Sequence, residues 1–247
     1  MKRAQRIVSM YPEGLIYRVV SGVRDRQGKL EVGEAVSLGL PDIESFLADN
    51  PHEVRVGVLP ATDALLRTIR LPPIPLKDLP GLIPYEAHQQ IPFPLDEVYW
   101  GYRVKLDGEI IERDIPADGE TVRIIEERGH MINVGAVGKI RANEYFPFDG
   151  LAVLTLAPSV LPAVYRRRLE KSGKPEALLS VDSNNTNFVI CKDGFIRWTR
   201  SLRSLSTSPQ GYIVDELGRS MAFWRGIKTE SCDVESAFFH NALNVIL

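Results

Sequence analysis

The sequence predicts an α/β fold in which a βββαβ unit occurs twice, with a small α+β subdomain inserted into the first copy. Two observations support this prediction. The order strand, strand, strand, helix, strand spans residues 5–59 and recurs over residues 177–239, about 170 residues later. Between the copies, residues 71–106 combine a proline-rich entry, an apolar segment at helical spacing, a proline break and an alternating run.

The first copy consists of short apolar segments separated by turn residues. Pro12 and Gly14 separate the first two of these segments, which predicts a β-hairpin. Pro41 stands at the first turn of the predicted helix, where its missing N–H costs no hydrogen bond. The predicted strands are residues 5–10, 15–20, 30–38 and 54–59, and the predicted helix is residues 41–47.

The second copy shows the same order of elements. Asp193-Gly194 is a dipeptide that favours a two-residue hairpin turn. After Pro209, the residues Ile213, Leu217 and Met221 recur at helical spacing and predict a helix. The predicted strands are residues 177–182, 186–192, 195–202 and 233–239, and the predicted helix is residues 209–228.

The inserted subdomain contains the clearest change of period in the chain. Apolar residues at helical spacing precede the break Ile91-Pro92-Phe93-Pro94, and residues 98–106 then alternate, which predicts a helix followed by a strand with one buried face. The charge-rich residues 107–129 predict an exposed hairpin or loop. Further predicted elements are strands at 131–137 and 151–156 and helices at 139–146 and 158–172. The predicted division is a first lobe (1–69 and 147–175), an insertion (70–146) and an incomplete second lobe (176–247).

Composition limits the classes of function. The 247 residues carry a net charge of −2 and a pI of about 6.1, which gives no electrostatic case for binding nucleic acid or an anionic membrane. No apolar run is long enough to span a bilayer, and the N-terminus lacks the apolar core of a signal peptide. Cys191 and Cys232 are predicted to be buried thiols. We therefore expect a soluble cytoplasmic protein.

The inserted stretch also carries a family resemblance. The order Leu71-Pro72, Pro75, Glu86-Ala87 and Ile91-Pro92-Phe93-Pro94-Leu95-Asp96-Glu97-Val98 resembles the PilM family. These are actin-like proteins on the cytoplasmic side of the type IV pilus assembly machinery. The resemblance implies an actin-like fold whose two halves each resemble ribonuclease H. It also implies that this chain is a divergent member without the C-terminal subdomain.

The resemblance implies a nucleotide site, but the corresponding residues are altered. Actin-like proteins hold ATP phosphates in two turns, each between the first two strands of a half. The first turn here, Ser9–Gly14, has no aspartate in the strand and no glycine pair, and Pro12 and Glu13 disfavour phosphate. The second keeps a remnant of the phosphate turn: Asp182, Ser183, Asn184, Asn185 and Thr186. Either weak anion binding or a turn stabilised by asparagine side chains is consistent with this remnant.

These departures predict a pseudo-ATPase without a bound cofactor, although ATP with Mg²⁺ is the alternative that the fold offers. The region after the last strand, His240–Asn244, also lacks the expected pair of glycines. The four histidines show no zinc-binding spacing, and neither a nucleophile elbow nor a Walker lysine motif is present. We therefore predict no catalytic residue and no metal ligand.

The resemblance implies a scaffold that binds the cytoplasmic N-terminal segment of PilN, an inner-membrane protein, along with other pilus or secretion assembly components. Such a protein would lie in the cytoplasm, peripheral at the inner membrane through its partners, without nucleic acid and without entering the bilayer. The alternatives are the cytoplasmic domain of a GspL-like type II secretion protein and an actin-like protein that still binds ATP. The candidate partner-binding residues are Ile91, Pro92, Phe93, Trp100 and Tyr102.

Overall fold

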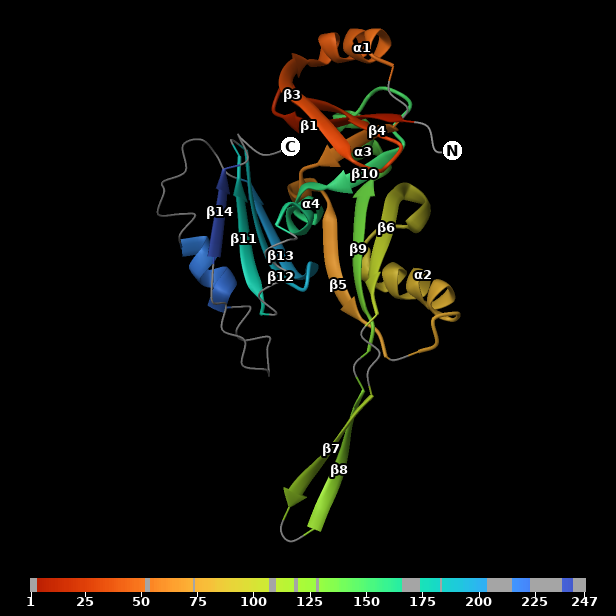
Figure 1. Cartoon of the computed structure of the whole chain (residues 1–247), viewed down its shortest axis with the longest axis vertical. Coiled ribbons are helices and arrows are strands. Elements are labelled where there is room, and N and C mark those ends of the chain that lie inside the picture. The colour runs from red at the N-terminus through yellow and green to blue at the C-terminus, as the bar shows by residue number, and fades with distance from the viewer. Residues whose placement is uncertain are drawn as a thin grey trace. The chain divides into compact units, whose positions relative to one another are not determined.

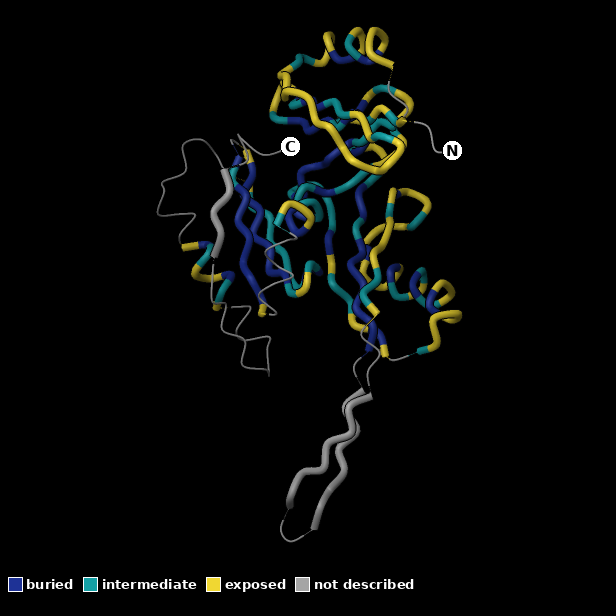
Figure 2. The backbone as a smooth tube through the Cα atoms, viewed as in Figure 1, coloured by how far each residue is buried: buried dark blue, intermediate teal, exposed yellow. Residues whose placement is uncertain are grey.

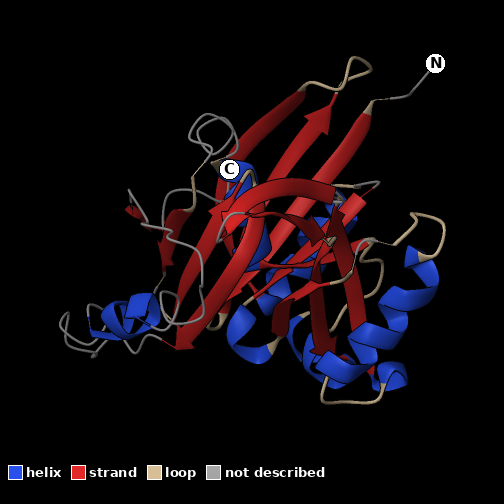
Figure 3. Cartoon of the chain, turned by 90° about the horizontal axis from the view of Figure 1, so that it is seen from below, coloured by secondary structure: helices blue, strands red, loops and turns tan. Residues whose placement is uncertain are grey.

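The computed structural model describes residues 4–51, 54–72, 74–106, 110–117, 120–127, 129–165, 174–182, 184–203, 215–222 and 237–241; residues 110–127 and 237–241 are described as backbone only. The chain divides into two compact units. Unit 1 comprises Met1–Ala64 and Lys139–Leu247, and unit 2 is Leu65–Gly138. Strands make up most of the described chain (Figure 3).

The first sheet of unit 1 has the strand order β10-β4-β1-β2-β3. Figure 1 labels β1, β3, β4 and β10 of this sheet. The neighbours β1–β2 and β2–β3 are antiparallel, whereas β1–β4 and β4–β10 are parallel. Its strands are β1 (Gln5–Glu13), β2 (Ile16–Arg24), β3 (Leu30–Gly39), β4 (Val54–Leu59) and β10 (Val153–Leu156).

The second sheet of unit 1 repeats this topology with the order β13-β12-β11-β14. Here β11–β12 and β12–β13 are antiparallel and β11–β14 is parallel, as β1–β4 is in the first sheet. Its strands are β11 (Glu176–Val181), β12 (Asn185–Lys192), β13 (Phe195–Arg203) and β14 (Ala237–Asn241). The duplicated βββαβ architecture predicted from the sequence is therefore confirmed.

Local sequence explains the helices and turns of unit 1. In α1 (Leu40–Asp49), Ile43 and Leu47 lie one turn apart and are both buried. The predicted turn at Asp193-Gly194 is confirmed, because both residues have positive φ and join Lys192 to Phe195. The remaining helices of unit 1 are α3 (Lys139–Tyr145), α4 (Ala157–Val164), the short 3₁₀ turn η1 (Ala61–Asp63) and residues 215–222.

Both sheets of unit 1 contain strands with buried residues (Figure 2). Val8, Met10 and Val19 are fully buried in the first sheet. In the second, Phe188 and Trp198 meet edge to face, with ring centroids 5.6 Å apart. Cys191 is buried, as predicted, while Cys232 lies outside the described residues.

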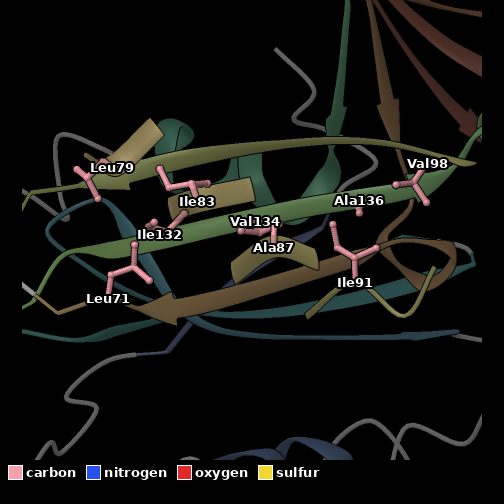
Figure 4. Packing of buried hydrophobic residues seen from close by; sticks show 9 residues of the cluster. All are labelled: Leu71, Leu79, Ile83, Ala87, Ile91, Val98, Ile132, Val134 and Ala136. Atoms are coloured by element: carbon pink, nitrogen blue, oxygen red, sulfur yellow. The ribbon is translucent and has the colours of Figure 1, made fainter. Parts of the chain in front are cut away.

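Unit 2 is a three-stranded antiparallel sheet of order β5-β9-β6 with one helix and a separate hairpin. Leu79, Ile83 and Ala87 follow one another at four-residue intervals on α2 and pack against Ile132, Val134 and Ala136 of β9 (Figure 4). The elements of unit 2 are β5 (Leu65–Arg70), α2 (Leu79–Gln90), η2 (Leu95–Glu97), β6 (Val98–Lys105), β7 (Ile110–Ala117), β8 (Glu120–Glu127) and β9 (Met131–Gly138).

The boundaries of unit 2 differ from the predicted insertion, 70–146. Strand β5 was not predicted, and its pairing with β9 moves the start of the unit to Leu65. At the other end, α3 belongs to unit 1, because Tyr145 and Arg141 bond to Asp63 there. Parts of the predicted helices 158–172 and 209–228 and of the predicted strand 233–239 lie outside the described residues.

Candidate functional site

The turn between β11 and β12 is organised around the carboxylate of Asp182. Oδ1 of Asp182 accepts hydrogen bonds from the backbone N–H groups of Asn184, at 2.8 Å, and of Asn185, at 2.6 Å. Asp182 is 9 % exposed and follows directly on β11. The two N–H groups that could face a phosphate are therefore bonded within the turn. The aspartate stabilises this turn through its side chain, the role that the sequence had suggested for asparagines.

Tyr11 brings the other half of unit 1 to the same carboxylate. It lies on β1, is 3 % exposed, and its hydroxyl donates to Oδ2 of Asp182 at 2.5 Å. Burial raises the pKa of the Tyr11 hydroxyl far above its usual value, and the nearby charge of Asp182 raises it further. Tyr11 therefore stays protonated and remains a hydrogen-bond donor across the physiological range of pH.

The two turns themselves lie against each other. Gly14, at φ +67°, opens the β1–β2 turn, and a Cβ placed on it would lie 3.6 Å from Nδ2 of Asn184. Thr62 of η1 donates to Oδ1 of Asn185 at 3.1 Å. Glu13, the last residue of β1, is held by Arg18 at 2.7 Å. The turns of the two halves thus meet through side-chain contacts where the actin-like resemblance predicts phosphates.

A second polar cluster joins the halves at Asp63. Its carboxylate accepts hydrogen bonds from Tyr145, from Arg141 at 3.2 Å and from Arg203 of β13 at 2.6 Å. Burial acts to raise the pKa of Asp63, but the hydrogen bonds from Tyr145, Arg141 and Arg203 outweigh it, so the pKa lies below its usual value. Burial and the bond to Asp63 raise the pKa of Tyr145 to about 12. Asp63 and its partners link the two halves of unit 1, and no sequence motif indicates this link.

An apolar cavity of about 340 Å³ lies beside the Tyr11–Asp182 contact in unit 1. Alternate residues of β1, together with residues of β2, β3, β4 and α4, form its walls. Ser180, Asp182 and Asn187 of the second sheet, all of them buried, also line it. No local pattern in the sequence indicates this cavity, because the residues that line it come from segments up to 180 residues apart.

The predicted partner-binding residues fall into two groups in unit 2. Ile91 ends α2 and is 3 % exposed within the core, so it is a packing residue, which corrects its inclusion in the partner surface. Phe93 is 58 % exposed and Tyr102 is 48 % exposed. Pro92 is exposed next to Phe93, and Trp100 is half-buried and stacks on Tyr102 with ring centroids 6.2 Å apart.

Of the predicted phosphate-turn remnant, Asp182, Asn184, Asn185 and Thr186 lie together in the β11–β12 turn, whereas Ser183 lies outside the described residues. Within the described part of the chain, no group of three or more histidine, cysteine or acidic side chains is placed to hold a metal ion. No described helix is long and apolar enough to cross a membrane.

Comparison with known proteins shows similarity in structure but not in sequence. No family model matches the chain, and no curated protein matches it in sequence. A PilM–PilN type IV pilus biogenesis complex is similar in structure, with a TM-score of 0.60 at 16 % identity, over 95 % of this chain and 81 % of that one. The cytoplasmic domain of EpsL, an inner membrane component of the type II secretion system of Vibrio cholerae, gives a TM-score of 0.51 at 11 % identity, over 96 % and 82 %.

A protein of Bacteroides thetaiotaomicron with an actin-like ATPase fold and unknown function gives a TM-score of 0.49 at 9 % identity, over 96 % of this chain and 81 % of that one. The chain therefore has an actin-like fold, as the sequence predicted, and its similarities include assembly proteins of the pilus and secretion machineries.

Proposed function

We propose that this chain is a non-catalytic scaffold of a type IV pilus, or related secretion, assembly complex at the inner membrane. Its partner is the cytoplasmic N-terminal segment of a PilN-like membrane protein, and it lies on the cytoplasmic side, held at the membrane through its partners. The observation that carries the proposal is the structural similarity to the PilM–PilN complex over 95 % of the chain. The sequence from Leu71 to Val98 points to the same family independently.

The contacts at Asp182 support the non-catalytic part of the proposal. A nucleotide site of this fold needs backbone N–H groups for the phosphates and a free carboxylate for the metal and water. Here the N–H groups of Asn184 and Asn185 and the hydroxyl of Tyr11 are all bonded to Asp182. Nucleotide binding would have to break these bonds and separate Gly14 from Asn184.

Thermal unfolding in the presence of nucleotide tests this part. We expect no change in Tm with millimolar Mg-ATP, because a ligand raises Tm only when it binds the folded state. Two controls lack the metal-bound triphosphate: ADP has no γ-phosphate, and EDTA removes Mg²⁺ from ATP. Micromolar affinity for Mg-ATP in a calorimetric titration would contradict a degenerate site.

Exposed aromatic side chains of unit 2 support a protein partner there. Phe93 and Tyr102 expose about half of their surface, and Trp100 stacks on Tyr102. These residues lie on or just before β6, which is the last strand of its sheet, and a partner segment can extend a sheet at such an edge. Aromatic side chains at an exposed edge supply the contact area typical of binding hot spots.

Calorimetric titration with a synthetic N-terminal peptide of a PilN-like protein from the same organism tests the partner. We expect saturable binding that F93A and Y102A each weaken by about 5- to 30-fold, the loss typical of an interface hot spot. Y85A is the matched control, because Tyr85 is 63 % exposed on α2 and lies outside the proposed surface. A folded protein that gives no binding heat would refute the partner assignment.

The similarity to the EpsL cytoplasmic domain favours a second candidate, the cytoplasmic part of a type II secretion protein. The two candidates differ in what the gene encodes after Leu247. A continuation into about 20 apolar residues, enough to cross a bilayer as a helix, would favour the secretion protein. A gene for a PilN-like protein next to this one would favour the pilus scaffold.

A further inference from the structure

The cavity in unit 1 has an apolar wall and a polar end. Ile7 and Tyr11 of β1, Val58 of β4 and Leu161 of α4 belong to the wall, and the polar end is formed by Ser180 and Asp182. Its volume of about 340 Å³ is at the lower end of the range for small-molecule sites. The mouth lies at Leu30, Val32 and Val164, which are 51 %, 44 % and 40 % exposed.

The polar end offers hydrogen-bond acceptors and a negative charge. Oδ1 of Asp182 accepts two backbone N–H groups and, at 3.4 Å, the side-chain amide of Asn185, while Oδ2 accepts only the hydroxyl of Tyr11 among the described residues. Each oxygen of a carboxylate has about two acceptor positions, so Oδ2 can take one more donor. The hydroxyl of Ser180, a residue only 8 % exposed, has no hydrogen-bond partner within the described part of the chain.

The charges at the cavity determine which ligands it can accept. Its described lining contains no lysine, arginine or histidine, and Asp182 is its single carboxylate. A phosphate or carboxylate head would meet like charge without a compensating cation, whereas an ammonium or hydroxyl head would complete the bonding of Asp182. The lining therefore discriminates against nucleotides and fatty acids alike.

We propose that this cavity binds a small aliphatic molecule that carries one hydrogen-bond-donating head, an ammonium or a hydroxyl group. The head donates to Oδ2 of Asp182 and bonds to the hydroxyl of the buried Ser180. The aliphatic chain lies between β1 and α4 and extends towards the mouth at Val32 and Val164. This inference is independent of the partner proposed for unit 2.

The test is calorimetric titration of the full chain at pH 7 with octylammonium, 1-octanol and octanoate. We expect one-to-one saturable binding of the first two and at least about 10-fold weaker binding of octanoate, a discrimination within the range of one charge contact. Hexylammonium should bind about 15-fold more weakly than octylammonium, since each buried CH₂ contributes about fourfold in affinity. D182N should reduce the preference of the cavity for the ammonium over the alcohol.

Cavity-filling substitutions locate the site. V160W should abolish binding of both octylammonium and 1-octanol, because Val160 of α4 lines the cavity. V36W is the matched control, since Val36 of β3 is 39 % exposed and is not a lining residue. If circular dichroism shows that V160W is unfolded, V164W at the mouth replaces it. Absence of saturable binding, octanoate binding as tight as octylammonium, or full binding by the folded cavity-filled variant would each overturn the proposal.

Discussion

Replacing Tyr11 with phenylalanine tests whether the contact at Asp182 holds the two halves of unit 1 together. The substitution keeps the ring and removes only the hydroxyl, whose 2.5 Å bond to Oδ2 is the shortest link between β1 and the β11–β12 turn among the described contacts. A hydrogen bond to a charged group contributes about 1.5–3 kcal/mol, and Asp182 is buried, so water cannot replace the lost donor freely. We expect Y11F to lower the free energy of unfolding by about 2 kcal/mol.

Urea denaturation and a thermal scan measure this loss. For a chain of this length, about 2 kcal/mol corresponds to a fall in Tm of about 4–8 °C. Y85F is the matched control, because Tyr85 is exposed on α2, and it should change stability by less than about 0.5 kcal/mol. In a D182N background the cost of Y11F should shrink, since the charged acceptor is gone. A loss with Y11F no larger than that with Y85F would refute the assignment of Tyr11 as a link between the halves.

Three further substitutions test the packing and electrostatics of each unit. G57A should destabilise unit 1 by about 1–3 kcal/mol, because the added Cβ would lie 2.8 Å from the buried ring of Phe146. G101A is the control, since a Cβ on Gly101 meets nothing within 4 Å and should have little effect. Urea denaturation compares the two variants. I83A should cost about 2–5 kcal/mol in unit 2, since Ile83 is 2 % exposed in its core, and an unchanged midpoint in urea would contradict that packing. The folded-state pKa of Asp63 is lowered, so its contribution to stability is present above about pH 4 and is lost as the pH falls through the folded-state pKa. D63N should therefore flatten the acid end of the plot of stability against pH. An unchanged plot would count against the Asp63 cluster.

The repeat and most elements could be predicted from the sequence because they depend on local pattern. Alternation along 54–59 predicts the bounds of β4, and the dipeptide Asp193-Gly194 predicts the β12–β13 turn. The apolar spacing of Leu79, Ile83 and Ala87 predicts the buried face of α2. In each case the information lies within a few residues along the chain.

The contacts that define the candidate site could not be predicted because they are long-range. Tyr11 and Asp182 are 171 residues apart, and nothing in the local sequence of either indicates the bond. Strand β5 escaped prediction for the same reason, since its partner β9 begins about 60 residues later. Ile91 was predicted to contact a partner because it stands in a distinctive motif, but it completes the core beneath α2.

The site residues that the sequence did locate are those with a chemical reason to stand at a turn. Asp182 at the end of a strand predicted a special turn, and its carboxylate does organise the β11–β12 connection. The structure gives Glu13, one of the departures from the phosphate-binding pattern, a partner of its own, because it pairs with Arg18 beside the turn. The sequence lacks the glycines that the resemblance leads one to expect, and the structure shows which contacts these two turns make.

Hydrogen–deuterium exchange of the full chain, with the PilN-like peptide and separately with Mg-ATP, tests the proposed scaffold most directly. We expect the peptide to slow exchange along β6 and at the end of α2 in unit 2. We expect Mg-ATP to leave exchange unchanged at the β1–β2 and β11–β12 turns of unit 1. Slower exchange at those turns with Mg-ATP, together with no protection of β6 by the peptide, would contradict the account and favour a nucleotide-binding protein.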